Sequence, residues 1–132
     1  MPQLTISQAA RQVGARPSAI RYYEQIGILA PPERRGGQRR YGENAVYRLA
    51  LILRARELGF SLDEIRRLCF GFPDGTPASR RWRELSRKKL ADLEAQARRI
   101  EAMQAVLRCL QRRCRCRELD ECGRAMFLAA GR

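Results

Sequence analysis

The 132-residue sequence contains no histidine, and its 27 basic residues outnumber its 14 acidic residues almost two to one. Without imidazole, a metal site must use sulfur, or sulfur together with oxygen. The sequence also lacks a glycine-rich phosphate loop behind a strand and paired carboxylates in an apolar setting. These absences predict a protein that is not an enzyme.

Long apolar runs are missing as well. No run approaches the length of about 18 residues that a membrane-spanning helix needs. The segment from Met1 to Thr5 has neither a basic region nor an apolar stretch, so we expect no export signal and no membrane partner. The expected location is the cytoplasm, where thiols are kept reduced. The five cysteines are therefore interpreted as ligands or redox groups before structural disulfides.

The excess of positive charge gives a formal net charge of +13. Such an excess favours a polyanionic partner, of which nucleic acid is the commonest, although charge can also serve solubility. Residues 1–60 alone carry ten arginines and four acidic residues. The positive charge is therefore already present in the N-terminal part of the chain.

Two short helices joined by a tight turn are expected near the N-terminus. Thr5 and Gln8 have the spacing of a capping box, and a helix that starts there should end at Gly14. Pro17 opens a second helix over residues 18–25. This pattern predicts a helix-turn-helix whose second helix presents Ser18, Arg21 and Tyr22 to DNA. The alternative is that Arg21 is simply solvated.

A basic hairpin is expected after this motif. Two prolines stop any helix at residues 31 and 32, and Gly36-Gly37 permits a tight turn. The segment carries the candidate DNA-binding residues Arg35, Arg39, Arg40 and Tyr41. A hairpin beside a helix-turn-helix is typical of a wing that lies along the phosphate backbone, with Arg39 the best single candidate for a phosphate contact. An ordinary basic loop is the alternative.

The middle of the chain predicts two further helices. The first runs over about residues 44–58 with Val46, Leu49, Leu53 and Leu58 inside. The second starts at a capping box formed by Ser61 and Glu64 and ends near residue 71. Cys69 lies on its apolar face and is interpreted as a small buried hydrophobe.

A long helix over residues 76–113 follows, with Thr76 as its cap and Pro77 at its first position. Its apolar residues recur in steps of three and four along roughly 50 Å. They are Leu90, Leu93, Ala97, Ile100, Met103, Leu107 and Leu110. Because the chain offers few other helices to cover this stripe, a second copy is expected to pair with it as a two-helix coil. A core helix of a monomeric bundle is the alternative.

Cysteines gather where the long helix ends. Cys114, Cys116 and Cys122 fall within nine residues, and Cys109 precedes them as a possible fourth member. Neighbouring arginines should favour the thiolate form, which binds metals and reacts. The pattern predicts a soft site, against the alternative of unligated thiols.

The sequence resembles the MerR family of bacterial transcription regulators. The resemblance rests on TISQAARQVGARPSAIRYYEQIGIL, on RRYGENAVYRLALILRARELGFSLDEI and on the long helix that ends in cysteines. It implies a mainly α fold: a winged helix-turn-helix DNA-binding domain (1–72), a dimerisation helix forming an antiparallel coiled coil (76–113) and an effector-sensing loop and tail (114–132). It also implies a homodimer that remodels double-stranded promoter DNA for RNA polymerase. In this match Arg21 and Tyr22 fall on the recognition helix, while Arg39 and Tyr41 fall on the wing.

The identity of the effector stays open between three readings. In copper-type relatives, Cys114 and Cys122 match the two ligand cysteines, and Ser79 matches a serine near the metal. This suits Cu(I) or Ag(I), whereas the additional Cys116 makes a three-thiolate site for a divalent soft ion possible. The redox-sensing SoxR branch implies a [2Fe–2S] cluster, but Cys109 stands at a different spacing from the first cysteine of that branch. A metal-free thiol switch is the third reading.

Two further expectations concern the tail and the overall role. Residues 126–128 are expected to form a short helix that covers the site or packs on the coil. An alternative function is a constitutive DNA-binding architectural protein whose tail is held by zinc.

Overall fold

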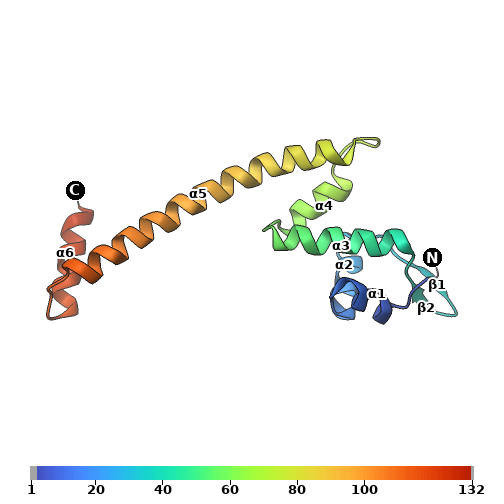
Figure 1. The fold of residues 1–132 in the computed structure, drawn as a ribbon, viewed down its shortest axis with the longest axis horizontal. Helices are drawn as coiled ribbons and strands as arrows, with labels where there is room; N and C mark the ends of the chain where they lie inside the picture. The colour runs from blue at the N-terminus through green and yellow to red at the C-terminus, as the bar shows by residue number, and fades with distance from the viewer. Residues whose placement is uncertain (1–2, 132) are drawn as a thin grey trace. The chain divides into compact units, whose positions relative to one another are not determined.

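The structure is a computed structural model that describes residues 3–131. It is mainly helical, with a two-stranded hairpin, as the sequence predicts (Figure 1). Its two compact units are Met1–Lys89 and Leu90–Arg132. The long helix α5 (Ala78–Arg113) contributes residues to both units.

The predicted helix-turn-helix is present at the start of the first unit. Helix α1 spans Ile6–Val13 and begins with the capping box of Thr5 and Gln8, each side chain accepting a bond from the other residue's backbone N–H. Gly14 ends it in the left-handed region with φ 72°, a conformation that glycine adopts without strain. Helix α2 spans Pro17–Gln25, with the proline in its first turn, and contacts α1.

The predicted hairpin is formed by β1 (Glu33–Arg35) and β2 (Gln38–Arg40), which pair antiparallel. Gly36 and Gly37 connect them with φ values of 58° and 79°. Two consecutive positive φ angles are the signature of the tight hairpin turn that glycine favours. Leu4 and Tyr41 exchange two backbone hydrogen bonds of 2.8 Å, which tie the base of the hairpin to the segment before α1.

Helix α3 (Glu43–Glu57) supplies much of the core of this unit. Val46 and Leu49 are buried as predicted, but the row continues through Ile52 and Ala55, each 0% exposed. The prediction for Leu58 was wrong, since its side chain is 47% exposed. Leu58 is the C-cap residue, and its N–H still donates to the carbonyl of Arg54 at 3.0 Å, so it follows the helix but lies on its exposed side.

Helix α4 (Leu62–Phe70) begins with the predicted capping box of Ser61 and Glu64. Ile65 and Leu68 pack into the core, and Phe60 lies edge-on against Trp82 of α5. Two ion pairs join α4 to the first turns of α5: that of Lys89 with Glu64 at 2.9 Å and that of Arg67 with Glu84 at 3.0 Å.

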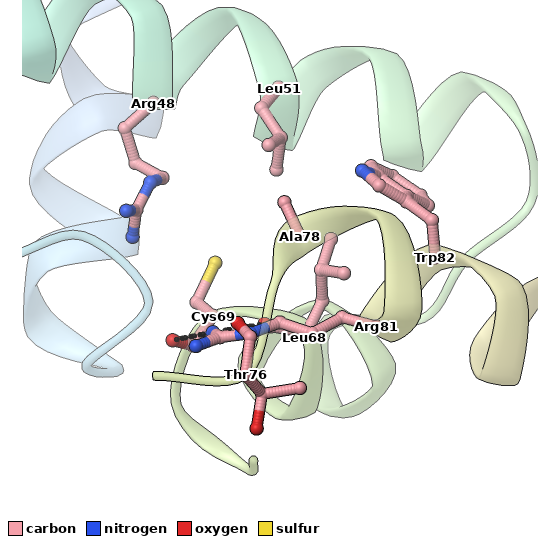
Figure 2. A pocket seen from close by; sticks show the side chains of 8 residues that line it. All are labelled: Arg48, Leu51, Leu68, Cys69, Thr76, Ala78, Arg81 and Trp82. Atoms are coloured by element: carbon pink, nitrogen blue, oxygen red, sulfur yellow. Dashed lines mark hydrogen bonds between the residues drawn. The ribbon is translucent and has the colours of Figure 1, made fainter. Parts of the chain in front are cut away.

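Cys69 lies beside a cavity of about 280 Å³ in the first unit (Figure 2). Arg81 crosses this region and donates from Nη1 to the carbonyls of Leu68 and Cys69, both at 3.1 Å. Cys69 is half-buried, and desolvation by burial raises the pKa of its thiol. Cys69 packs against the core, but it is less buried than the sequence predicts.

Helix α5 spans Ala78–Arg113. The prediction that Thr76 caps it was wrong: Thr76 stands two residues before the first helical residue, and its hydroxyl donates to the carbonyl of Pro73 at 2.7 Å. Pro77 stands directly before the first helical residue, and its carbonyl accepts from the N–H groups of Arg80 and Arg81. Thr76 therefore lies one residue too early to cap the helix amides.

In the second unit, every α5 residue from 90 to 113 is exposed, including the whole apolar stripe. Helix α6 spans Leu119–Ala130, which is longer than the predicted helix at 126–128. It begins before Cys122, so this cysteine lies on a helix and not in the expected loop. Within residues 3–131, no helix combines the length and apolar character required to cross a membrane.

Candidate functional site

The outer face of α2 carries the three residues predicted to read DNA. Ser18, Arg21 and Tyr22 are all exposed, and their spacing of three and four places them on one helix face. The opposite face buries Ile20 and Tyr23 in the core. We call α2 the recognition helix from here on, because it is the second helix of the helix-turn-helix.

The hairpin presents its arginines in different ways. Arg35 on β1 is exposed, whereas Arg39 and Arg40 on β2 are half-buried. Arg40 donates to the side chain of Gln38 at 3.3 Å. Arg39 donates from Nε to Glu24 Oε2 of the recognition helix at 3.0 Å. Arg35 therefore has the freest guanidinium of these three for a phosphate.

Tyr41 lies in the core, so its side chain is not presented at the surface for the predicted contact with DNA. Its side chain is 1% exposed and its hydroxyl donates to Glu24 Oε1. The backbone bridge to Leu4 orients this residue toward the core. Burial, followed by the bond to Glu24, raises the pKa of Tyr41 well above its usual range, so the hydroxyl remains a donor.

Glu24 is a residue to which the sequence analysis assigned no role. Its side chain is only 10% exposed, and its two carboxylate oxygens accept from Arg39 and Tyr41. The available signal was its acidity, since it is one of four acidic residues in the basic segment 1–60. Its partners lie 15 and 17 positions away, and no local spacing rule connects them.

The second unit brings three thiols together. The sulfur atoms of Cys114, Cys116 and Cys122 all lie within 4.8 Å of one another, and the Cys114–Cys122 distance is 3.8 Å. Cys114 directly follows α5, Cys116 lies in the connection, and Cys122 is in the first turns of α6. The end of one helix and the start of the next thus hold the cluster.

Hydrogen bonds among these groups separate their acidities. The backbone N–H of Cys116, and then the thiols of Cys122 and Cys116, lower the pKa of Cys114. The same thiol contacts, with Cys122 the larger, raise the pKa of Cys116. Arg115 lowers the pKa of Cys114 only as a smaller cause, and its guanidinium donates to the carbonyls of Arg112 and Cys114 at 3.0 Å. The predicted effect of arginine is therefore secondary to hydrogen bonding.

Two other candidates lie outside this cluster. Cys109 is exposed on α5 and is not one of the three thiols that lie together. Ser79 is exposed in the first turn of α5 and belongs to the first unit. The predicted roles of both residues stay predictions.

A helix-turn-helix followed by a glycine-tipped hairpin defines a winged helix-turn-helix DNA-binding protein. Residues 4–70 match the model of the MerR helix-turn-helix regulatory protein family, and residues 46–110 match the MerR DNA-binding model. The chain belongs to the MerR family. It is a DNA-binding transcription regulator and not an enzyme, as the sequence predicts.

The similarity extends over nearly the whole chain. A transcriptional regulator of Pseudomonas aeruginosa is 34% identical over 129 residues, which are 97% of this chain and 98% of that protein. The heavy metal-dependent transcription regulator 2 of Rhizobium meliloti is 33% identical and covers 90% of this chain and 82% of its own. The structure of PbrR691 from Ralstonia metallidurans in complex with lead(II) is similar with a TM-score of 0.73 and 27% identity, covering 87% of this chain and 91% of that one.

Proposed function

We propose that this chain is a metal-responsive regulator in which Cys114, Cys116 and Cys122 bind a thiophilic ion and thereby change how the protein holds promoter DNA. The observation that carries this proposal is the convergence of three sulfur atoms within 4.8 Å in one chain. The names of the Rhizobium meliloti relative and of the lead(II) complex support a metal as the effector.

The donor set favours a soft ion. Thiolates select ions such as Cu(I), Ag(I) and the heavier divalent metals over hard cations. Cys114 and Cys122 alone would suit a two-coordinate monovalent ion, whereas adding Cys116 gives three sulfur donors. Because all three thiols already lie together, we favour a divalent ion held by three sulfurs.

An iron–sulfur cluster has less support. A [2Fe–2S] cluster takes four protein ligands as a rule. The described residues bring three thiols together, and Cys109 lies outside their group. The metal ion is therefore the preferred effector over the cluster.

Regulation requires two copies. The exposed apolar stripe of α5, with Leu107 61% and Ile100 54% exposed, would be covered by the same stripe of a second chain in an antiparallel coil. Pairing places two recognition helices on one duplex, as helix-turn-helix proteins commonly require. The proposed unit is a homodimer that acts with RNA polymerase in the cytoplasm. Residues 1–72, 76–113 and 114–132 serve as its DNA-binding, dimerisation and sensing parts.

The experiment is an anaerobic titration of the purified protein with Pb(II), Hg(II), Ag(I) and Cu(I), followed by ultraviolet thiolate-to-metal absorbance. Transcription in vitro from a promoter bound by the wild type is measured in parallel. We expect one of these ions to raise transcription, and Cys114→Ser and Cys122→Ser to abolish this response while DNA affinity is kept.

The matched control is Cys109→Ser, which removes a thiol of the same unit outside the cluster. It should respond to the metal as the wild type does. A wild-type response in both Cys114→Ser and Cys122→Ser would exclude the proposed site. A brown protein with visible absorbance would instead indicate the cluster.

A further inference from the structure

Two side chains of the hairpin segment converge on a single carboxylate of the recognition helix. Arg39 Nε donates to Glu24 Oε2 at 3.0 Å, and the Tyr41 hydroxyl donates to Glu24 Oε1. The side chain of Glu24 is 10% exposed, against 30% for Arg39. Both oxygens of a nearly buried carboxylate are therefore used by the wing.

This arrangement has a clear physical reason. A carboxylate that is removed from water is unfavourable unless charged or polar donors satisfy it. Hydrogen bonds to an ionised group are stronger than those between neutral groups. The Tyr41 hydroxyl keeps its proton because burial raises its pKa. The carboxylate thus holds two donors at fixed positions on α2.

The hairpin needs such an anchor. Its strands have three residues each, and an isolated two-stranded hairpin is marginally stable at best in water. The angle between β2 and the recognition helix must therefore come from contacts with the rest of the unit. The Leu4–Tyr41 bridge fixes the base of the hairpin, and the contacts of Glu24 connect β2 directly to α2.

We propose that Glu24 is a positioning residue for DNA binding: it fastens the wing to the recognition helix, and Arg39 and Tyr41 act through it. This inference rests on DNA binding alone and is independent of the metal site. It replaces the prediction that Arg39 binds a phosphate. A guanidinium that neutralises Glu24 cannot fully neutralise a phosphate without giving up that pair.

A model in which Glu24 only restrains Arg39 predicts the opposite change in DNA affinity. If Glu24 merely held Arg39 back from a phosphate, Glu24→Gln would release the guanidinium and tighten binding. If Glu24 positions the wing, the same substitution weakens binding. Gln keeps the size of the side chain and an acceptor for Tyr41, so the change removes chiefly the charge and the pair with Arg39.

The experiment measures affinity for a duplex that the wild-type protein selects from a random-sequence pool, at a temperature where thermal unfolding shows each variant fully folded. The matched control is Glu57→Gln, which removes the same charge from an exposed ion pair with Arg54 on α3. We expect Glu24→Gln to bind about tenfold more weakly than this control. Affinity for a scrambled duplex should fall less, which a loss of stability alone would not produce.

Arg39→Ala, made in both backgrounds, tests whether Arg39 acts through Glu24. We expect it to weaken binding in the wild type and to add nothing to Glu24→Gln, as coupled partners do. The salt slope, which is the change of log affinity with log salt concentration, should be the same for Arg39→Ala as for the wild type. Each lost phosphate contact would change this slope by about 0.9.

Two outcomes overturn the proposal. One is binding by Glu24→Gln as tight as, or tighter than, that of Glu57→Gln. The other is a reduced salt slope for Arg39→Ala in both backgrounds. Should Glu24→Gln fail to fold, Tyr41→Phe replaces it. That variant removes one donor to the same carboxylate and is expected to weaken specific binding without changing the salt slope, and an unchanged affinity would overturn the proposal.

Discussion

At the residue scale, Glu24 and the three clustered thiols show how neighbours decide chemistry. Arg39 and Tyr41 carry groups that commonly contact DNA, yet one carboxylate recruits both. Cys114 and Cys116 are two residues apart, but their pKa values move in opposite directions. The backbone N–H of Cys116 is the largest cause that lowers the pKa of Cys114, and the thiol of Cys122 is the largest cause that raises the pKa of Cys116. The residue type therefore limits which contacts a side chain can make, and its neighbours in the fold determine which of these contacts it makes.

Tyr41→Phe should change how stability depends on pH. The folded state raises the pKa of Tyr41, so the hydroxyl contributes stability that is fully present below the unfolded pKa of about 10. Above that pH the unfolded chain loses its proton first, and the contribution declines. We expect the wild type to be more stable than the variant at pH 8, and the difference to shrink between pH 10 and 12 in urea unfolding. A difference that is constant over this range would contradict the burial of a protonated hydroxyl.

Cys116→Ser tests the number of sulfur ligands. If three thiolates hold a divalent ion, losing one of them should strongly weaken Pb(II) binding. The loss should be at least as large as that for a residue that only supports a ligand, which is about 10- to 100-fold. Ag(I), which needs only Cys114 and Cys122, should bind with nearly unchanged affinity. Competition with a chromophoric chelator measures both, with Cys109→Ser as the control. Equal losses for both ions, or none, would argue against the three-sulfur site.

At the scale of single elements, local rules account for most boundaries. The capping boxes at Thr5 and Ser61 and the glycine pair of the hairpin lie where their spacing predicts. The exceptions are the start of α5 and the start of α6. Thr76 bonds to Pro73 instead of the helix, and α6 extends far enough toward the N-terminus to include Cys122.

Ser61→Ala and Thr76→Ala should therefore differ. Ser61 accepts from the backbone N–H of Glu64 at 3.1 Å, and losing such a cap reduces the free energy of unfolding by about 1 kcal/mol. Thr76 caps no helix amide, so its substitution should have less than about half of that effect. Chemical denaturation of both variants measures the difference, and equal effects would show that Thr76 also acts as a cap.

At the scale of the whole molecule, charge and the exposed stripe of α5 have the largest consequences. A net charge of +13 attracts DNA over a distance set by the salt concentration. The α5 stripe leaves six large side chains between 37% and 61% exposed. They are Leu90, Leu93, Ile100, Met103, Leu107 and Leu110. Such a continuous apolar surface is typical of a protein interface.

Leu107→Glu should convert a dimer into monomers. A carboxylate within the apolar seam of the proposed coil would be buried without a partner, which is strongly unfavourable. Light scattering should then give the mass of one chain in place of two, and binding to a duplex with two half-sites should weaken. Ala102→Glu, which places the same charge on the opposite, exposed face of α5, is the control. A wild type that has the mass of one chain while binding DNA normally would refute the dimer.

The sequence by itself determined the order of the helices, the helix-turn-helix with its hairpin and the grouping of cysteines, because capping, turn residues and apolar periodicity act within a few positions. The family followed from the resemblance of its motifs to those of known regulators. Only the tertiary structure decided that Tyr41 lies inside, that Arg39 is paired with Glu24, and that Cys109 stays apart from the other thiols. These outcomes depend on contacts between side chains that are 15 or more positions apart and on the path of the connection between α5 and α6. Such meetings follow from the packing of the folded chain, and short-range spacing does not encode them.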